Sequence, residues 1–517
     1  MRRYLYMGVF FAGFTSLAVE LSASRLLGNY FGSSNLVWAV IIGLILIYLS
    51  VGYTIGGRWA DRSPNPGSFF KILLWAALGV GLIPLASRPI LRMASQAFDQ
   101  MQTPAMIGAF VSVLLLFSIP VTLLGTASPF AIRLALATRD EAGTIAGRIY
   151  TISTLGSFLG TFFPVLLLIP ALGTYLTFVT ISSIMMAVAL LGLWQTVSLK
   201  AAMVNIWMPV LLAVCSLIGM RGLDKEARNI IYEGESAYNY IQVQEIEETR
   251  ILRLNEGQGI HSIWHPTRDN FFGAWEQVLV APFFNSQMTD LDDIQSMAIL
   301  GLAAGTSARQ AASVFPNIHI DGYEIDDVII QIGEQYFDMR MPELTTYADD
   351  ARWGITNNPK RYQVISVDAY RPPYIPWHLT TVEFFRETYD HLEEDGALVI
   401  NIARIFDDRR LVDSLFATIS AVYPSVYVTD IPDSFNTMVF ATKSPTDFNN
   451  LIGNYIALST KETTPPLLLT SMQITILNRQ PDPEEGMILT DDHAPVEWIT
   501  NQMILNFFVS GEAGKLQ

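Results

Sequence analysis

Seven long apolar segments lie within the first 221 of the 517 residues, and they restrict the fold more than any other feature of the sequence. Each is about long enough to cross a hydrocarbon layer of about 30 Å as a helix. Backbone polar groups in such a layer must be satisfied within the segment, which favours a helical bundle. The expected segments are 4–27, 34–57, 69–87, 105–132, 145–170, 173–195 and 202–220. Residues 1–221 therefore predict a multi-pass α-helical membrane domain of about seven helices.

Charge is distributed unequally along the chain. Residues 1–221 contain 13 Lys and Arg and 5 Asp and Glu, whereas the rest contains 19 and 43, a net charge of −24. An acidic surface of this kind argues against nucleic-acid binding. It weakly favours a cationic ligand, although a solvated acidic surface is the commoner explanation. Cys215 is the single cysteine and the six histidines are scattered, so neither a disulfide nor a metal site is expected.

A strand, a glycine turn and a helix start follow one another around Gly301. The apolar run 297–300 precedes the small residues 301–305, and a second strand at 318–323 ends in Glu324. Glycines allow a backbone to approach a nucleotide closely, and an acid at the next strand end accepts hydrogen bonds from ribose hydroxyls. This layout predicts an adenosine site in a Rossmann-like domain of the class I methyltransferase type.

The C-terminal half is expected to contain three regions. A linker and small antiparallel β-sheet occupy 222–290, the Rossmann-like nucleoside-binding catalytic domain 291–445, and a C-terminal helical extension 446–517. Further strands at 362–368, 397–402 and 436–441 imply a parallel sheet with helices on both faces. Ligands bind at the carboxyl ends of such strands. Those ends bring Gly301, Glu324, Asp350 and Asp368 to one rim.

From about Tyr238 to Ala441 the chain resembles the spermidine synthase (aminopropyltransferase) family, in particular its membrane-fused bacterial branch. The segment 20–28 extends the likeness more loosely into the membrane half. The resemblance implies an S-adenosylmethionine or decarboxylated S-adenosylmethionine donor, an amine or polyamine-like acceptor and release of methylthioadenosine. The residues that match donor-binding positions of the family are Gln242, Asp269, Gly301, Gly305, Glu324, Asp350 and Asp368. Asp269 would face the donor's ammonium and Asp350 the adenine amino group.

The chain departs from the family pattern at two positions. Ala304 replaces the aspartate of the glycine turn, and Arg371 replaces the second aspartate of Asp-Ser-Ser-Asp-Pro, which binds a diamine acceptor. An arginine would repel putrescine or select a carboxylate-bearing partner, and Arg268 and Arg404 leave the same alternative open. The segment 490–497 offers replacement acids for the acceptor in Asp491, Asp492 and Glu497. Alternatively, Thr490 or Asp491 caps a helix that begins near Pro495.

The expected chemistry is attack by an amine on a carbon next to a sulfonium. Asp368 is the candidate base that takes the proton of the amine, and Tyr370 either orients the amine or only packs. A methyltransferase on the same fold, and an enzyme that cleaves or cyclises S-adenosylmethionine internally, remain alternatives. A transporter or sensor with a nucleoside-binding domain is an alternative of another class, suggested by Glu20 and Arg25 within an apolar segment.

The expected location is a bacterial cell membrane, with the lipid bilayer as a partner and the catalytic domain in the cytoplasm. Basic residues near the segment ends predict a cytoplasmic N-terminus. Seven crossings would then export the catalytic domain, whereas its nucleoside donor is made in the cytosol. One of the seven segments must therefore fail to cross, or the charge rule misleads here. A homodimer is left open.

Overall fold

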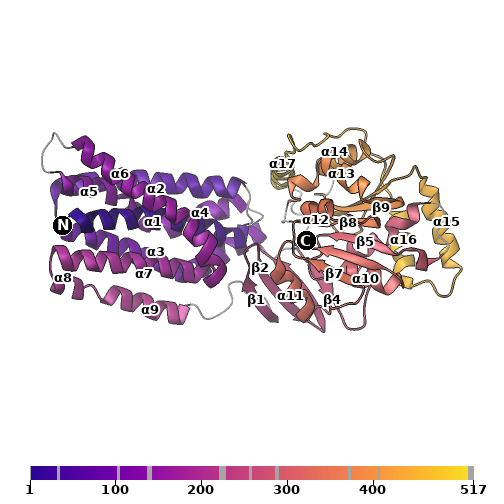
Figure 1. The fold of residues 1–517 in the computed structure, drawn as a ribbon, viewed down its shortest axis with the longest axis horizontal. Coiled ribbons are helices and arrows are strands. Elements are labelled where there is room, and N and C mark those ends of the chain that lie inside the picture. Colours follow the sequence, from indigo (N-terminus) through magenta and orange to yellow (C-terminus); the bar gives the residue numbers. More distant parts are fainter. Residues whose placement is uncertain are drawn as a thin grey trace. The chain divides into compact units, whose positions relative to one another are not determined.

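The computed structural model describes residues 2–31, 35–101, 105–136, 142–219, 229–255, 259–285, 290–370, 374–405 and 408–509. The chain divides into two compact units, Met1–Glu226 and Ala227–Gln517. Figure 1 shows that the first is built of helices and the second of strands and helices. Each unit is described by itself.

The N-terminal unit is a bundle of long apolar helices. Six of its described segments are long and apolar enough to cross a membrane. The helices are α1 Arg2–Phe31, α2 Asn35–Arg62, α3 Pro66–Met101, α4 Ala105–Gly125, α5 Ala127–Ala135, α6 Ala142–Phe163, α7 Ile169–Thr196, α8 Leu199–Met203 and α9 Trp207–Gly219, with a π-helical segment η2 at Pro164–Leu168. The expectation of a multi-pass helical membrane domain is confirmed.

The count of segments differs from the expected seven because 142–196 forms one continuous helical stretch of 55 residues. A straight helix of that length would extend about 80 Å. The stretch reverses direction instead, at Gly173, which has φ +76°. Gly160 and Ile181 both lie against Phe14 of α1, although a straight helix would separate them by about 31 Å. Two expected segments thus share one helical stretch.

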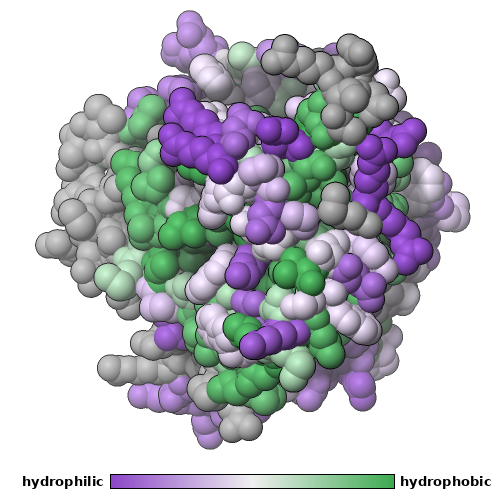
Figure 2. Space-filling model, turned by 90° about the vertical axis from the view of Figure 1, so that its left-hand side faces the viewer, coloured by the Kyte–Doolittle hydropathy of each residue, from purple (hydrophilic) through white to green (hydrophobic). Residues whose placement is uncertain are grey.

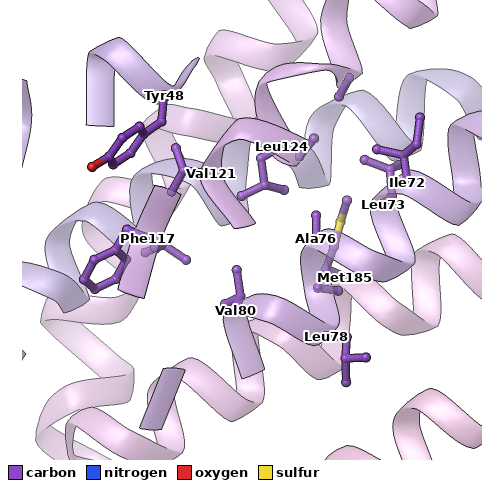
Figure 3. Packing of buried hydrophobic residues seen from close by; sticks show 14 of the residues in the cluster. Tyr48, Ile72, Leu73, Ala76, Leu78, Val80, Phe117, Val121, Leu124 and Met185 are labelled. Atoms are coloured by element: carbon purple, nitrogen blue, oxygen red, sulfur yellow. The ribbon is translucent and has the colours of Figure 1, made fainter. Parts of the chain in front are cut away.

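Apolar side chains and glycines hold the bundle together. Figure 3 shows part of the buried cluster, in which Phe117 and Val121 of α4 lie near Val80 of α3. On the outside, Leu46, Ile119 and Leu166 are more than half exposed, as expected for side chains that face lipid. Figure 2 looks onto the end of this unit at which α1 begins and shows hydrophilic and hydrophobic residues mixed there.

The C-terminal unit begins with an antiparallel sheet of β1 Ile230–Glu235, β2 Tyr240–Ile246, β3 Thr249–Leu254 and β4 Ser262–Trp264, in that order. The small antiparallel sheet expected here is confirmed. Its apolar face, with Ile241 and Val243, packs against Ala304 and Ile329 of the larger domain. The small sheet therefore covers one side of the glycine turn.

The larger sheet has seven strands in the order β10-β11-β9-β8-β5-β6-β7. The strands are β5 Ser296–Leu300, β6 His319–Tyr323, β7 Leu344–Tyr347, β8 Tyr362–Val367, β9 Leu392–Ala403, β10 Ser425–Asp430 and β11 Asn436–Thr442. The five strands β9, β8, β5, β6 and β7 are parallel. The expectation of a parallel sheet is confirmed for these five strands. It is wrong for the strand expected at 436–441, because β11 runs antiparallel between β9 and β10. A short β10–β11 connection joins them as a hairpin and excludes a parallel crossover.

Helices cover both faces of this sheet, so the Rossmann-like expectation is confirmed. One face is covered by α10 Thr306–Val314, the 3-10 segment η3 Trp275–Phe284, α15 Phe448–Ser459 and α16 Pro466–Leu477. The other is covered by α12 Ala351–Asn357, α13 Val382–Asp390, α14 Arg410–Ser420 and α17 Val496–Val509. The helix α11 Asp327–Tyr336 packs against the small sheet. Buried faces on both sides explain the continuous apolar runs 297–300 of β5 and 397–400 of β9.

Candidate active site

The glycine turn brings the carboxyl ends of two neighbouring strands into contact. Gly301 has φ +99°, and a Cβ added there would lie 2.5 Å from the carbonyl oxygen of Asp368. Gly305 has φ +77° and precedes α10. Both positions require a residue without a side chain, because the left-handed conformation and the close approach exclude a Cβ. The turn therefore presents backbone to whatever binds at this edge of the sheet.

Glu324 follows β6 and faces the same turn. Its Oε2 accepts from the backbone N–H of Ala303 at 3.0 Å, and its Oε1 accepts from that of Asp326 at 3.2 Å. Burial nevertheless raises the pKa of Glu324 to about 7. Each carboxylate oxygen keeps acceptor capacity beyond these bonds. A ribose diol is a ligand that would use this remaining capacity.

Asp350 stands at the start of α12, next to the end of β7. Its Oδ1 accepts from the backbone N–H groups of Arg352 and Trp353, both at 3.0 Å, and its Oδ2 lies 3.0 Å from Nε2 of His378. The hydrogen bond from His378, above all, lowers the pKa of Asp350. Asp350 is therefore ionised at neutral pH and held in one orientation.

Asp368 follows β8 and is a half-buried carboxylate, which accepts one side-chain hydrogen bond within the described part of the chain. Nδ2 of Asn401 donates to its Oδ1 at 2.9 Å. Burial raises the pKa of Asp368 to about 7, and the bond from Asn401 acts in the opposite direction. A carboxylate with this pKa can accept a proton near neutral pH, which suits a general base.

Asn401 was missed by the reasoning from sequence. It lies near the carboxyl end of β9, and its Oδ1 is buried without a hydrogen-bond partner among the described residues. A buried amide oxygen without a partner is costly unless a ligand supplies the donor. The rule that selected Asp368, a polar residue at a strand end, also applies to Asn401 at the end of the expected strand 397–402.

Tyr370 points its hydroxyl group at the backbone of β9. The hydroxyl donates to the carbonyl of Asn401 at 3.1 Å and accepts from the N–H of Ala403 at 2.6 Å. Burial raises its pKa well above the usual value. These two bonds favour packing, the second of the two roles considered for Tyr370, because they tie the loop after β8 to the end of β9.

Gln242 and Asp269 lie on segments that flank the glycine turn. Nε2 of Gln242 donates to Tyr240 at 2.8 Å and to Glu233 at 3.1 Å. Asp269 is exposed, and its carbonyl accepts from Gln310 of α10 at 2.7 Å. The loop that carries Asp269 is held by Glu276, a buried acid absent from the expected set, which accepts from the N–H groups of Phe271 and Gly273.

The acids proposed for the acceptor are placed differently from one another. Both oxygens of Asp491 accept from Arg352, at 2.8 and 2.9 Å, and Oδ1 also accepts from Thr381. Asp492 is exposed, and Glu497 lies in the first turn of α17. Thr490 and His493 close a tight turn before α17, which begins at Val496. Asp491 is thus paired with an arginine and does not cap the helix.

The arginines singled out in the sequence have their own partners where they are described. Nε of Arg404 lies 3.4 Å from Asp430, and Arg409 bonds the same carboxylate at 2.7 Å. Arg268 donates to Thr249 at 3.2 Å. Arg371 lies outside the described residues.

The four strand-end positions expected at one rim are brought together. They follow β8, β5, β6 and β7, which are consecutive neighbours in the sheet. Backbone bonds link their ends, from the N–H of Asp368 to Leu300 and from the N–H of Glu324 to Tyr347. The N–H of Asp349, next to Asp350, donates to the carbonyl of Glu324 at 3.1 Å. The rim therefore presents three acids around a glycine turn.

Three relatives are similar to this chain over different portions. A probable polyamine aminopropyl transferase of Bifidobacterium longum is 32% identical over 300 residues, 55% of this chain and 65% of the relative, just under two thirds of its length. A polyamine aminopropyltransferase of Vibrio vulnificus is 30% identical over 42% of this chain and 73% of its own. Polyamine aminopropyltransferase 2 of Aquifex aeolicus is 23% identical over 86% of this chain and 89% of its own.

Among solved structures, a probable spermidine synthase from Corynebacterium glutamicum is similar with a TM-score of 0.39 and 21% identity, over 46% of this chain and 90% of that one. No family model matches the chain.

Proposed function

We propose that this chain, which belongs to the polyamine aminopropyltransferase family, transfers an aminopropyl group from decarboxylated S-adenosylmethionine to an amine acceptor and releases methylthioadenosine. The observation that carries the proposal is the placement of Gly301, Glu324, Asp350 and Asp368 at the ends of four adjacent strands. At Gly301 the backbone of the turn would lie against the donor, and Glu324 would accept from its ribose hydroxyls. Asp350 would contact the adenine, and Asp368 would contact the reacting amine.

The reaction needs little covalent participation from the protein. The nitrogen of the acceptor forms a bond to the carbon next to the sulfonium, and the carbon–sulfur bond breaks, leaving a neutral thioether. The acceptor must lose one proton, which Asp368 would take. Its pKa of about 7 allows it to be ionised before the reaction and protonated after it. The buried Oδ1 of Asn401 would accept an N–H of the same amine.

The donor could also be intact S-adenosylmethionine, and the choice would depend on the segment with Asp269. A carboxylate there favours a donor whose side chain ends in an ammonium group without a carboxylate. Asp269 is exposed and can receive such a group. On the acceptor side, Asp368 is an acid without a cationic partner in the part of the chain described, whereas Asp491 is paired with Arg352.

The helical unit would anchor this chemistry in a bacterial cell membrane. Its six long apolar segments support that location. The last segment is interrupted at Val204–Ile206, which leaves α9 with 13 residues. A helix of that length extends about 20 Å, less than the hydrocarbon layer. Because the stretch 142–196 reverses at Gly173 and would cross twice, the six segments would make seven crossings. An incomplete last crossing would leave six, an even number, and keep the catalytic unit in the cytoplasm with its donor.

Product analysis tests the proposal. The purified full-length protein is incubated with decarboxylated S-adenosylmethionine and, separately, S-adenosylmethionine, each with and without a panel of amines, and the products are identified by mass spectrometry. Methylthioadenosine formed only when donor and amine are both present supports the proposal. S-adenosylhomocysteine as the sole nucleoside product would make the protein a methyltransferase. Methylthioadenosine formed without any amine would indicate internal cleavage of the donor.

A further inference from the structure

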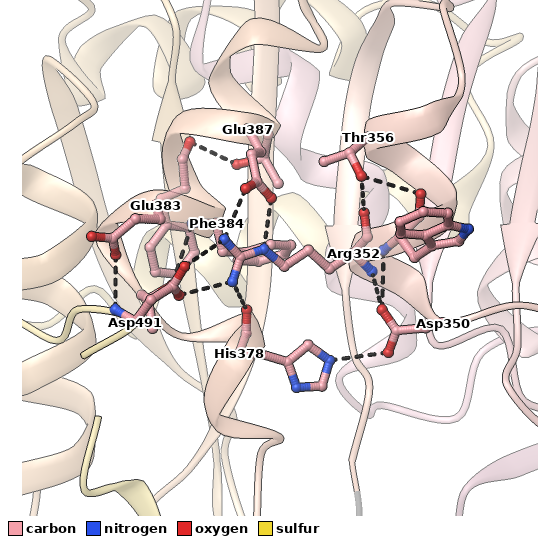
Figure 4. Close-up of polar contacts among 12 residues, drawn as sticks. Asp350, Arg352, Thr356, His378, Glu383, Phe384, Glu387 and Asp491 are labelled. Carbon is pink, nitrogen blue, oxygen red and sulfur yellow. Dashed lines mark hydrogen bonds and ion pairs between the residues drawn. The ribbon is translucent and has the colours of Figure 1, made fainter. Parts of the chain in front are cut away.

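Arg352 is the centre of a polar network that the reaction chemistry does not require. All five of its N–H donors are used: Nε and Nη2 donate to Glu387 at 2.7 and 2.8 Å, Nη1 and Nη2 donate to Asp491 at 2.8 and 2.9 Å, and Nη1 also donates to the carbonyl of His378 at 3.1 Å. Figure 4 shows the guanidinium group of Arg352 with hydrogen bonds to the carboxylates of Glu387 and Asp491. A guanidinium with every donor paired is fixed in position and orientation.

The network ties the C-terminal segment to two helices far away in the sequence. Asp491 lies on the tight turn between Thr490 and His493, and its N–H donates to Glu383 of α13 at 3.0 Å. The preceding carbonyl of Leu489 accepts from the N–H of Val382 at 2.9 Å. The turn is therefore fixed to α13 by its backbone and to α12 by its carboxylate.

The same network reaches Asp350 by two routes. Arg352 is the second residue of α12, and its N–H donates to Oδ1 of Asp350. His378 is bonded through its carbonyl to Arg352 and through its ring to Oδ2 of Asp350. Arg352 thus holds the helix start and the histidine that together orient the carboxylate of Asp350.

We infer that Arg352 and Asp491 are positioning residues, through which the C-terminal turn at 490–493 orients Asp350 for recognition of the 6-amino group of the donor's adenine. This inference rests on the proposed function. It assigns to Asp491 a role on the nucleobase side, in place of the acceptor-binding role expected from the sequence. Arg352 bonds Asp350 and His378, and it would act on the donor through them.

The charges of the network explain why both acids are needed. Hydrogen bonds from Arg352 lower the pKa of Asp491, and bonds to Glu387 and Asp491 raise the pKa of Arg352. Loss of Asp491 would remove two of the five bonds and leave Arg352 bonded to Glu387 and to the carbonyl of His378. Loss of Arg352 would leave two carboxylates facing each other, which would disturb the fold itself. Asp491→Asn is therefore the informative variant.

The experiment compares two nucleosides that differ at position 6 of the base. The affinities of 5′-methylthioadenosine and 5′-methylthioinosine, which has a carbonyl in place of the amino group, are measured by calorimetry on the full-length protein. The wild type is expected to prefer methylthioadenosine by about tenfold or more. Asp491→Asn should reduce this preference about tenfold, while kcat at saturating donor and KM for the acceptor stay unchanged. The ratio of affinities does not depend on the fraction of folded protein.

Asp492→Asn is the matched control, since Asp492 is the exposed neighbour on the same turn and should keep the wild-type preference. A wild-type preference that persists in Asp491→Asn overturns the inference, and so does a wild type that binds both nucleosides equally. If the wild type binds neither nucleoside, the proposed function itself fails. A second variant, Arg352→Lys, cannot pair two carboxylates bidentately and should reproduce the loss of preference.

Discussion

Glycine serves different purposes in the two units of this protein. In the helical unit, Gly156 of α6 allows contact with α1, because a Cβ there would lie 2.0 Å from the carbonyl oxygen of Phe10. In the α/β unit, Gly301 allows a comparable approach to Asp368, at 2.5 Å, and in addition has φ +99°. The first glycine permits close helix packing. The second permits a backbone conformation that brings two strand ends, and the groups they carry, together.

Polar side chains also differ between the units. In the helical unit, Ser22 and Ser183 donate to carbonyls one turn earlier in their own helices. In the α/β unit, polar side chains connect distant segments, as Arg352 does with Asp491. A hydroxyl that bonds its own helix can be placed in an apolar layer at little cost. Our proposal assigns recognition and chemistry to the second unit. In the first, glycines and apolar side chains pack the helices together, with bonds between helices such as that from Ser182 to the carbonyl of Ala77.

The largest effect that would test this division is expected at Asp368. Asp368→Asn removes the base without changing the size of the side chain, so turnover should fall about 10²- to 10⁴-fold. Affinity for methylthioadenosine should stay unchanged. Rates come from product formation and affinity from calorimetry. Turnover that survives this substitution would show that the base lies elsewhere, and lost nucleoside affinity would show that Asp368 has a mainly structural role.

A smaller effect is expected at Glu324. Glu324→Gln removes the charge that ribose hydroxyls would bond, and affinity for methylthioadenosine should fall about 10- to 100-fold. Glu334→Gln on the neighbouring helix α11 is the control, because Glu334 forms a surface pair with Arg340. Equal affinities in the two variants, measured by calorimetry, would contradict the placement of the ribose at Glu324.

In the helical unit, Gly156→Val should lower stability by about 1–3 kcal/mol, because the added side chain collides with Phe10. Thermal unfolding in detergent measures the loss, and kcat per folded molecule should not change. Gly147→Val is the control on the same helix, since nothing lies within 4 Å of an added Cβ. If Gly156→Val changed kcat while Gly147→Val did not, the helical unit would take part in the chemistry.

The smallest expected effect is a shift of the pH dependence. Asp368 must be ionised to take a proton, so kcat/KM should fall below a pH of about 7. The N–H of Asn401 stabilises the ionised form and lowers the pKa of Asp368. Asn401→Leu removes that donor, so the acid limb of the profile should move to higher pH, by about one unit or less. If the acid limb is unchanged, or moves to lower pH, the pH profile does not report the ionisation of Asp368.

Several features of the fold and site were accessible from local patterns. Apolar segments of sufficient length predict the helical unit, and strand-end residues such as Glu324 and Asp350 predict the rim. The expected segments 145–170 and 173–195 are separated at the position where the chain reverses, next to Gly173. That the two form one continuous helical stretch was not expected. The antiparallel direction of β11 was missed, because period and composition do not specify which way a strand runs.

The amino-acid sequence by itself determined where the membrane-type helices lie, where the strands of the α/β unit end and which acids occupy those ends, because these depend on runs of neighbouring residues. The tertiary structure alone decided which side chains bond one another. Arg352 meets Asp491 across 139 positions, Tyr370 bonds the end of β9, and Asn401 faces Asp368. Such pairings arise only when the sheet order brings distant segments together, and no local pattern contains that order.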